Sequence, residues 1–158
     1  MPVEALTRVL SDGGVDFELL PHEQTMRAAD EAAVLSLSPQ EVAKTLVVTT
    51  PQGNVRAVLP ASERIDLRKL GEFAGESRKH VHLATEDDLS RDYPEFELGA
   101  VPPLGGSHGD RVIVDRRLAG RESIVLEAGS HNESVRVQTA DLIRIAQAEV
   151  ADICADEE

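Results

Sequence analysis

Apolar residues recur at two spacings along this chain, and the change from one spacing to the other marks the expected elements. Apolar positions three or four residues apart predict about five helices, at residues 3–10, 28–35, 67–73, 86–92 and 139–150. Short alternating or continuous apolar runs predict about seven strands, at residues 16–19, 45–50, 55–59, 81–84, 111–115, 123–127 and 134–137.

Capping residues indicate where the helices begin. An N-cap hydroxyl or carboxylate accepts a hydrogen bond from a free N–H of the first helical turn. Residues of this kind precede the helical segments at Thr25, Asp66, Thr85 and Thr139. The pattern from Ser38 to Glu41 predicts one more short helix, just before the strand that starts near Thr45. The acidic tail, residues 149–158, is expected to fray.

The order of these elements predicts the fold class. Turns at residues 51–54 and 128–132 join neighbouring strands into hairpins, and strands do not alternate regularly with helices. We therefore expect one α/β domain of the α+β type over residues 1–158, with a mixed or largely antiparallel sheet. The pattern shows no repeat, no second-domain boundary and no doubly wound nucleotide fold.

Residues 97–106, Glu-Leu-Gly-Ala-Val-Pro-Pro-Leu-Gly-Gly, are the most unusual stretch of the chain. Glycine permits positive φ and close approach to the backbone, whereas proline fixes φ and removes an N–H. A stiff loop of this kind can direct backbone N–H groups at a developing negative charge. The alternative interpretation is a tight connection between two elements.

Lys44 lies between two apolar pairs, Val42-Ala43 and Leu46-Val47. The chain has only three lysines, so its positive charge comes mainly from arginine. We expect the Lys44 ammonium to be partly desolvated and to offer a compact charge with three donors. The alternative is a lysine at a strand edge whose stem covers apolar surface while its ammonium stays in water.

Composition narrows the functional classes. The net charge of −13 argues against nonspecific binding of nucleic acid, although residues 56–82 and 110–121 are locally basic. The N-terminus lacks a signal sequence and no apolar run is of membrane-spanning length, so we expect a cytoplasmic protein. The single Cys154, set among acids, is expected to be inert.

The familiar motifs for phosphate loops, zinc sites and serine hydrolases are absent from the sequence. We therefore expect neither a metal nor a cofactor. His22 and His131 both lie in turns, which favours a functional role over that of the strand residues His80 and His82.

From about residue 22 to residue 153 the chain resembles the YbaK/EbsC/ProX family of free-standing aminoacyl-tRNA deacylases, which is related to the editing insertion of bacterial prolyl-tRNA synthetases. The resemblance rests on His22-x-x-Thr25, on the residues around Lys44, on 64–70, on 99–105, on 112–115 and on Ala128-Gly129-Ser130-His131. One departure is Leu104, where the family usually has Phe before the closing glycine of the loop.

The resemblance implies a fold, an activity and a set of site residues. The fold would be a partly closed mixed sheet surrounded by helices. The protein would hydrolyse mischarged tRNA without a metal. The expected substrate is a small amino acid on tRNA-Pro or a similar tRNA. The implied catalytic group is Lys44 with Gly99, Ala100 and Val101. The implied substrate-binding residues are His22, Thr25, Pro102, Pro103, Gly105, Gly129 and His131. The basic residues expected to guide the tRNA are Arg64, Arg68, Lys69, Arg116 and Arg117.

The expected partner is the 3′ acceptor end of aminoacyl-tRNA, and an aminoacyl-tRNA synthetase is a second candidate. We expect no binding to a membrane. A monomer is the favoured oligomeric state. A non-catalytic module that binds aminoacyl-tRNA or an amino acid is the alternative function. A structural interaction protein is a third, and it would place Lys44 and residues 97–106 away from any pocket.

Overall fold

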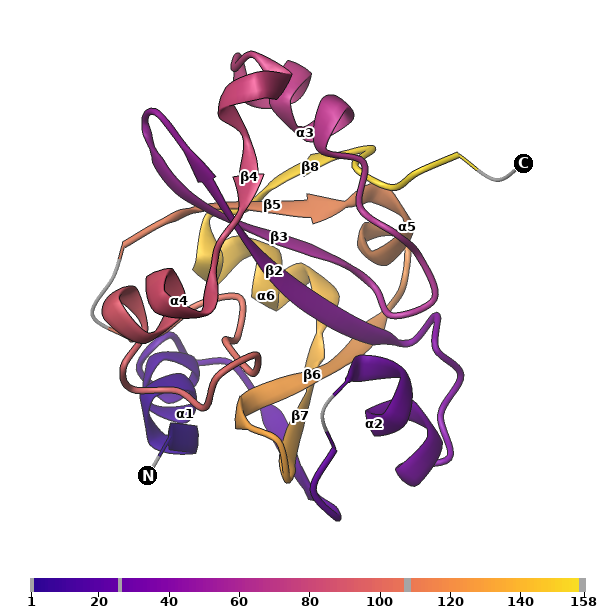
Figure 1. Ribbon diagram of the computed structural model, residues 1–158. Coiled ribbons are helices and arrows are strands. Elements are labelled where there is room, and N and C mark those ends of the chain that lie inside the picture. The colour runs from indigo at the N-terminus through magenta and orange to yellow at the C-terminus, as the bar shows by residue number, and fades with distance from the viewer. Residues whose placement is uncertain (1, 26, 107–108, 157–158) are drawn as a thin grey trace.

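The computed structural model of the protein describes residues 2–25, 27–106 and 109–156 (Figure 1). Its helices are α1 (Pro2–Asp12), α2 (Ala28–Val34), α3 (Leu67–Ala74), α4 (Glu86–Asp92), α5 (Arg116–Ala119) and α6 (Thr139–Ala146), with one 3-10 turn at Arg78–His80. Its strands are β1 (Phe17–Pro21), β2 (Val42–Thr50), β3 (Gly53–Pro60), β4 (His82–Leu83), β5 (Arg111–Asp115), β6 (Ser123–Ser130), β7 (Glu133–Gln138) and β8 (Glu149–Ala151).

All eight strands belong to one mixed sheet. Its order is β1-β7-β6-β2-β3-β5-β8, and β4 pairs separately with β2. The β2–β6, β3–β5 and β5–β8 pairs are parallel, and the remaining pairs are antiparallel. The two expected hairpins, β2–β3 and β6–β7, are confirmed, as is the mixed α/β fold class.

The sheet divides along one edge of β2. At the start of β2, Val42 and Ala43 pair with β6, and near its end Val48 and Thr49 pair with β4. Neither ladder includes Lys44, Thr45 or Leu46, so this part of the β2 edge lies open while the opposite edge is paired with β3 throughout. The long β2–β3 hairpin crosses the centre of Figure 1, with β6 and β4 diverging from it. This fork positions the candidate site.

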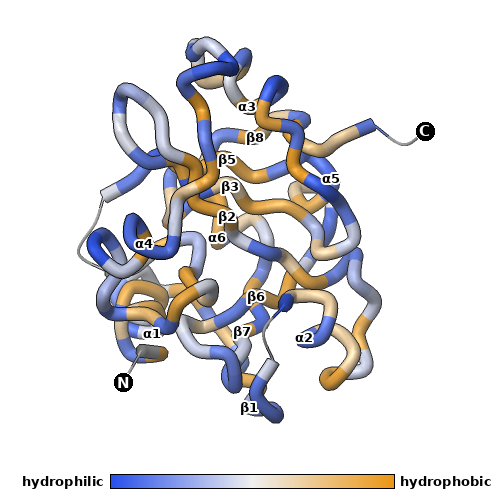
Figure 2. Tube along the Cα trace, viewed as in Figure 1, coloured by the Kyte–Doolittle hydropathy of each residue, from blue (hydrophilic) through white to orange (hydrophobic). Residues whose placement is uncertain are grey.

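Apolar side chains pack on both faces of the sheet. On one face Leu6 and Leu10 of α1 and Leu142 of α6 join a large cluster with β5, β6 and β7. On the other face Leu70 of α3 and Ile153 pack against the central strands. Figure 2 shows the hydrophobic residues concentrated along β3 and β5, whereas the tip of the β2–β3 hairpin is hydrophilic.

Two expected helix starts are wrong. Residues 38–41 form a turn, in which Ser38 N donates to Glu41 Oε2 at 3.1 Å and Glu41 N donates to Ser38 O at 3.0 Å. The capping bond forms, but β2 begins at Val42, so no room is left for a helix. The N-cap of α2 is Arg27, without a side-chain cap, because the Thr25 hydroxyl donates to His131 O at 3.3 Å instead.

The C-terminal end also differs from expectation. Thr139 is the first residue of α6 and its N-cap is Gln138; the helix ends at Ala146, where we expected it to reach residue 150. Residues 149–151 form β8 beside β5, so this part of the acidic tail is paired and does not fray. Residues 157 and 158 lie outside the described residues. Asp66 and Thr85 do cap α3 and α4, as expected.

Candidate active site

A pocket of about 350 Å³ lies in the fork of the sheet. It opens where β6 leaves β2 after Ala43, and the start of the glycine- and proline-rich loop forms its opposite wall. Four of the expected site residues meet there: Lys44, Gly99, Ala100 and Val101. The remaining lining residues are Arg27, Ala28, Ala29, Ala43, Thr45, Leu46, Ala61 and Glu127.

Lys44 is the half-buried cation of this pocket. Burial lowers its pKa, and the nearby Arg64 charge acts in the same direction while Glu63 opposes it. Among the residues that the structure describes, its ammonium has no ion pair within 4 Å and no hydrogen bond. A partly desolvated cation without a protein partner is available to an oxygen of a bound molecule.

The loop contributes backbone amides. Ala100 N donates to Glu97 O at 3.0 Å, so that amide is already used within the turn. The amides of Gly99 and Val101 donate to no group among the described residues. Gly99 has φ of +83°, a conformation that favours glycine, and it belongs to the pocket wall. Of the three residues expected to act through their backbone, two therefore offer free N–H groups.

The first half of the loop is held by the β6–β7 turn. Glu97 N donates to Gly129 O at 2.8 Å, and His131 N donates to the Glu97 carboxylate at 3.0 Å. The His131 ring donates through Nε2 to Leu98 O at 2.6 Å and lies directly behind Gly99. His131 is 97% buried and does not line the pocket, so the structure places it as a support of the loop.

The second half of the loop is held by Arg56. Its Nη1 and Nη2 donate to Pro102 O and Gly105 O, both at 2.9 Å, and its Nε donates to Asp110 at 2.7 Å. The Tyr93 ring covers the guanidinium at 4.9 Å, and the Tyr93 hydroxyl donates to Asp110. This arginine is 98% buried and is therefore a brace of the loop, although it opens the basic stretch 56–82 of the sequence.

Glu127 is the acid of the pocket. Val42–Val125 and Ala43–Leu126 are paired in parallel, so Lys44 and Glu127 are the next residues on the two diverging strands. Burial, followed by the Glu31 and Glu97 carboxylates, raises the pKa of the Glu127 carboxyl to about 8. Its Oε2 lies 3.2 Å from His131 Nδ1 without the alignment of a hydrogen bond.

The other expected substrate-binding residues surround the pocket without lining it. Pro102, Pro103 and Gly105 lie in the far half of the loop, where a Cβ on Gly105 would come within 2.9 Å of Ala5 O. Gly129 lies at the irregularity of β6, and Thr25 is bonded to His131 O. His22 Nε2 lies 2.8 Å from the Ser134 hydroxyl, which donates to the buried Glu31. Burial raises the pKa of Glu31 to about 7.

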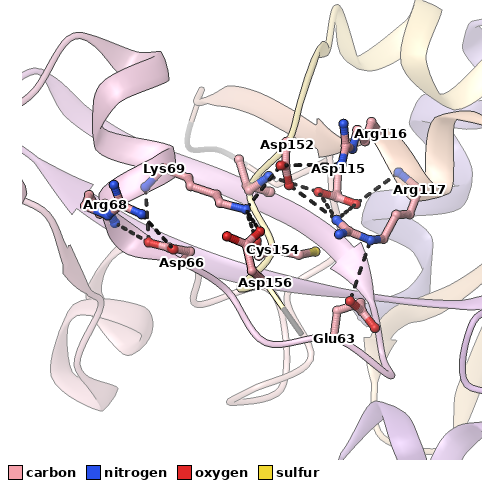
Figure 3. A network of polar contacts seen from close by, with 11 residues as sticks. Glu63, Asp66, Arg68, Lys69, Asp115, Arg116, Arg117, Asp152, Cys154 and Asp156 are labelled. Carbon is pink, nitrogen blue, oxygen red and sulfur yellow. Dashed lines mark hydrogen bonds and ion pairs between the residues drawn. The ribbon is translucent and has the colours of Figure 1, made fainter. Parts of the chain in front are cut away.

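Most of the basic residues expected to guide tRNA are paired with acids (Figure 3). Lys69 donates to Asp152, Asp156 and Cys154 O at 2.6–3.1 Å. Arg117 contacts Glu63, Asp115 and Asp152, and Arg116 lies 3.6 Å from Asp152. Arg68 has only loose pairs with Asp66 and Glu72, at 3.8–3.9 Å.

Arg64 is the exception among these five residues. It is exposed, lies close enough to Lys44 to lower the pKa of that lysine, and has no ion pair among the described residues. Cys154 is buried, and burial followed by the Asp115 carboxylate raises the pKa of its thiol to about 12.

Sequence reasoning missed three residues that shape the site: Arg27, Arg56 and Glu127. Arg27 gives no signal, because it is an ordinary exposed arginine paired with Asp30. The other two do give one. Arg56 and Glu127 are each the single charged residue of an apolar run, Val55–Leu59 and Ile124–Ala128, and a charge in such a run is costly unless it has a partner or a function.

The described residues, 2–25, 27–106 and 109–156, contain no group of three or more His, Cys, Asp or Glu residues that could hold a metal ion. They also contain no helix of the length and apolarity needed to cross a membrane.

Comparison with known proteins gives consistent matches over nearly the whole chain. The chain is 29% identical over 153 residues to the multifunctional Ser/Thr-tRNA deacylase ProXp-y of Escherichia coli K12, covering 93% of this chain and 89% of that protein. It is 22% identical over 151 residues to the prolyl-tRNA editing protein ProX of Acetoanaerobium sticklandii, covering 92% and 90% of the two chains.

Solved structures show the same fold. The crystal structure of a hypothetical protein, 27% identical, superposes with a TM-score of 0.87 and covers 96% of this chain and 100% of that one. A candidate trans-editing enzyme for prolyl-tRNA synthetase, 20% identical, gives the same TM-score with 98% coverage of both chains. The sequence matches the aminoacyl-tRNA editing domain over residues 22–145, which confirms the resemblance drawn from the motifs. The chain belongs to the aminoacyl-tRNA editing domain family.

Proposed function

We propose that the protein is a trans-editing deacylase, which hydrolyses the ester between a wrongly attached amino acid and the 3′ end of a tRNA. The observation that carries this proposal is the fork pocket, which is lined by Lys44, Gly99 and Val101; among the described residues, the Lys44 ammonium and the two loop amides have no hydrogen-bond partner. The relatives named as a Ser/Thr-tRNA deacylase and a prolyl-tRNA editing protein support the same reaction class.

The reaction needs stabilisation of a negative oxygen. Water adds to the ester carbonyl, the carbonyl oxygen becomes an oxyanion, and the ester C–O bond then breaks with transfer of a proton to the ribose oxygen. The Gly99 and Val101 amides would stabilise the oxyanion, and the braced loop keeps them in place before substrate arrives. The described residues that line the pocket include no Ser, Cys or His, and we assign Lys44 and Glu127 to binding, so we assign activation of water to a ribose hydroxyl of the substrate.

Lys44 and Arg64 would receive the negatively charged part of the substrate. Lys44 binds the phosphate of the terminal adenosine or the ester carbonyl, and Arg64, exposed and unpaired next to it, contacts a phosphate further along the acceptor strand. The remaining four basic residues are engaged with acids of the protein itself, so we assign them a smaller part in tRNA binding.

A second hollow of about 150 Å³ adjoins the pocket and shares Thr45, Leu46, Gly99 and Val101 with it. Its other lining residues are apolar, and Leu83 is 48% exposed there. We assign this hollow to the terminal adenine, because a flat base covers apolar side chains that would otherwise face water. The aminoacyl group then lies in the main pocket.

The test is deacylation of a panel of aminoacyl-tRNAs: Ser, Thr, Ala and Cys on tRNA-Pro, and Ser and Thr on their own tRNAs. We expect multiple turnovers on at least one of these substrates, and a loss of at least ~100-fold in kcat/KM for Lys44→Ala. Lys79→Ala is the matched control, because Lys79 is also a lysine but lies in an exposed 3-10 turn away from the pocket.

The panel also decides between the enzyme and the non-catalytic binder. A binder would protect the ester from spontaneous hydrolysis and would show no turnover at catalytic protein levels. Full activity of a folded Lys44→Ala variant would remove Lys44 from the mechanism. Absence of turnover on every substrate would contradict the proposed function.

A further inference from the structure

Glu127 is a largely buried acid that faces His131 in the free protein but makes no aligned hydrogen bond to it. Its side chain is 88% buried, and none of the described lysines or arginines lies within 4 Å of its carboxylate. Its Oε2 is fully buried without a hydrogen bond, and the same is true of the facing His131 Nδ1. A buried acid in an apolar run of a strand is costly unless a ligand uses it.

The surroundings of His131 indicate that Glu127 is protonated in the free protein, although this pair is not aligned as a hydrogen bond. Leu98 O is an acceptor 2.6 Å from His131 Nε2, so Nε2 carries a hydrogen. A neutral His131 therefore leaves Nδ1 as an acceptor, facing the Glu127 oxygen at 3.2 Å. Two lone pairs this close repel each other, and burial also disfavours the carboxylate, so both effects favour the neutral acid while no ligand ammonium is present.

We infer that Glu127 recognises the α-ammonium group of the aminoacyl ester. This inference rests on the proposed function and deepens it. The carboxyl lies one residue beyond the last paired position of β2 and β6, in the same pocket as the free Gly99 and Val101 amides. In an α-aminoacyl ester a single carbon separates the ammonium from the carbonyl, so both groups fit one small pocket. An ammonium supplies donors for the other carboxyl oxygen, Oε1, which is not among the fully buried atoms and accepts no hydrogen bond from the described residues, whereas Oε2 faces His131.

Recognition of this kind separates aminoacyl esters from other esters at the tRNA end. An α-hydroxyl group in place of the ammonium would remove the charge and leave the acid neutral, with almost no change of shape. The discrimination is therefore electrostatic and is independent of the amino acid side chain, whose selection belongs to the apolar walls such as Ala28, Ala29 and Ala61.

The test compares aminoacyl-tRNAs with their deaminated counterparts, alanyl- with lactyl-tRNA and seryl- with glyceryl-tRNA, on wild type and Glu127→Gln. We expect wild type to prefer the amino form at least ~10-fold in kcat/KM, mainly through KM, and Glu127→Gln to lose that preference for both pairs. Glu122→Gln is the matched control, because Glu122 is exposed at the other end of β6.

Retention of the preference by a folded Glu127→Gln variant would overturn the inference. An effect on seryl-tRNA alone would also overturn it, because it would assign Glu127 to the side-chain hydroxyl. If wild type hydrolyses neither alanyl- nor seryl-tRNA, the same comparison is made with whichever panel substrate it does hydrolyse. If it hydrolyses none of them, the proposed function fails and the binding readout below still tests Glu127.

That readout is calorimetry with non-hydrolysable 3′-alanylamido-3′-deoxyadenosine and its lactyl counterpart. The charged groups around Glu127 are Glu31 of α2, Glu97 of the loop and His131, and Lys44 and Arg27 share its pocket. Because an ammonium favours the ionised acid, the alanyl ligand should release a proton at pH 7 from wild type and none from Glu127→Gln. Equal proton release by the two proteins would contradict the inference.

Discussion

The pocket and the C-terminal network of Figure 3 both contain clustered charges, but they treat those charges differently. In the network, Lys69 and Arg117 are each bonded to two or three acidic or carbonyl groups that join α3, α5 and the C-terminal segment. In the pocket, Lys44 has no partner among the described residues, and Glu127 faces only His131, without an aligned hydrogen bond. Paired charges stabilise the arrangement of the chain, whereas we propose that Lys44 and Glu127 of the pocket bind a ligand.

Arg56 gives the largest expected effect, because it is the most deeply buried of the paired cations. Arg56→Ala leaves Asp110 buried without its cation and releases the Pro102 and Gly105 carbonyls. We expect the free energy of unfolding to fall by ~3–5 kcal/mol, measured by urea denaturation. Arg144→Ala, which breaks only an exposed pair with Asp141, should change it little. A small effect for Arg56→Ala would contradict the view that pairing serves the fold.

Two acids with raised pKa values, Glu127 of the pocket and Glu31 of α2, should make stability depend on pH. The folded-state pKa values of Glu127 and Glu31, about 8 and about 7, lie above the ordinary value of 4.5. The folded protein therefore holds more protons between these values, so stability falls as pH rises from about 4.5 to about 8. The measurement is the melting temperature between pH 5 and 9. We expect the melting temperature of Glu127→Gln to fall less than that of wild type, with the largest difference at the high-pH end of this range. A fall as steep as that of wild type would contradict the neutral state of this acid.

Gly99 tests whether the loop amides matter independently of stability. Ala at this position must adopt a φ near +83°, which costs ~1–2 kcal/mol and shifts the adjacent N–H groups. We expect Gly99→Ala to lower kcat/KM by ~10–100-fold. Gly75→Ala is the control, because Gly75 has φ of +79° with open space around it and ends α3 away from the pocket. Equal activity of the two variants would remove the loop amides from the mechanism.

Substitution of Arg64 gives the smallest expected effect. Its comparison with Arg68 tests whether an unpaired surface arginine contributes more to tRNA binding than a paired one. We expect Arg64→Ala to raise KM for aminoacyl-tRNA by ~3–10-fold and to reduce the salt dependence of binding by about one unit of slope. Arg68→Ala, at an equally exposed residue with loose ion pairs, should have less effect. The reverse order would contradict the assignment of the tRNA contact.

Local patterns in the sequence predicted more of the fold than of the site. Short-range sequence patterns determine the hairpins, most strands and the caps at Asp66 and Thr85. These features were therefore predictable. The β8 pairing was not, because it depends on β5, a strand more than thirty residues away, and on cations that neutralise Asp152 and Asp156.

Four pocket residues were predictable: Lys44 and residues 99–101, which were expected from the sequence motifs and line the pocket in the structure. Burial decided the rest. His131 has a functional residue type in a turn, yet the fold places its ring behind the loop. Lys69 was expected to contact tRNA, but Asp152, distant along the chain, pairs with it. The position of Arg56 in an apolar run indicates a buried partner, but the sequence does not identify that partner as Asp110.

The most direct test of the comparison is a paired measurement of deacylation and melting temperature on Lys44→Ala and Lys69→Ala. Both changes remove one lysine. We expect Lys44→Ala to lose deacylation and keep the wild-type melting temperature, and Lys69→Ala to keep its activity per folded molecule and melt at a lower temperature. The opposite result, or the same loss of stability in both variants, would contradict the claim that the unpaired pocket charge is kept for the substrate.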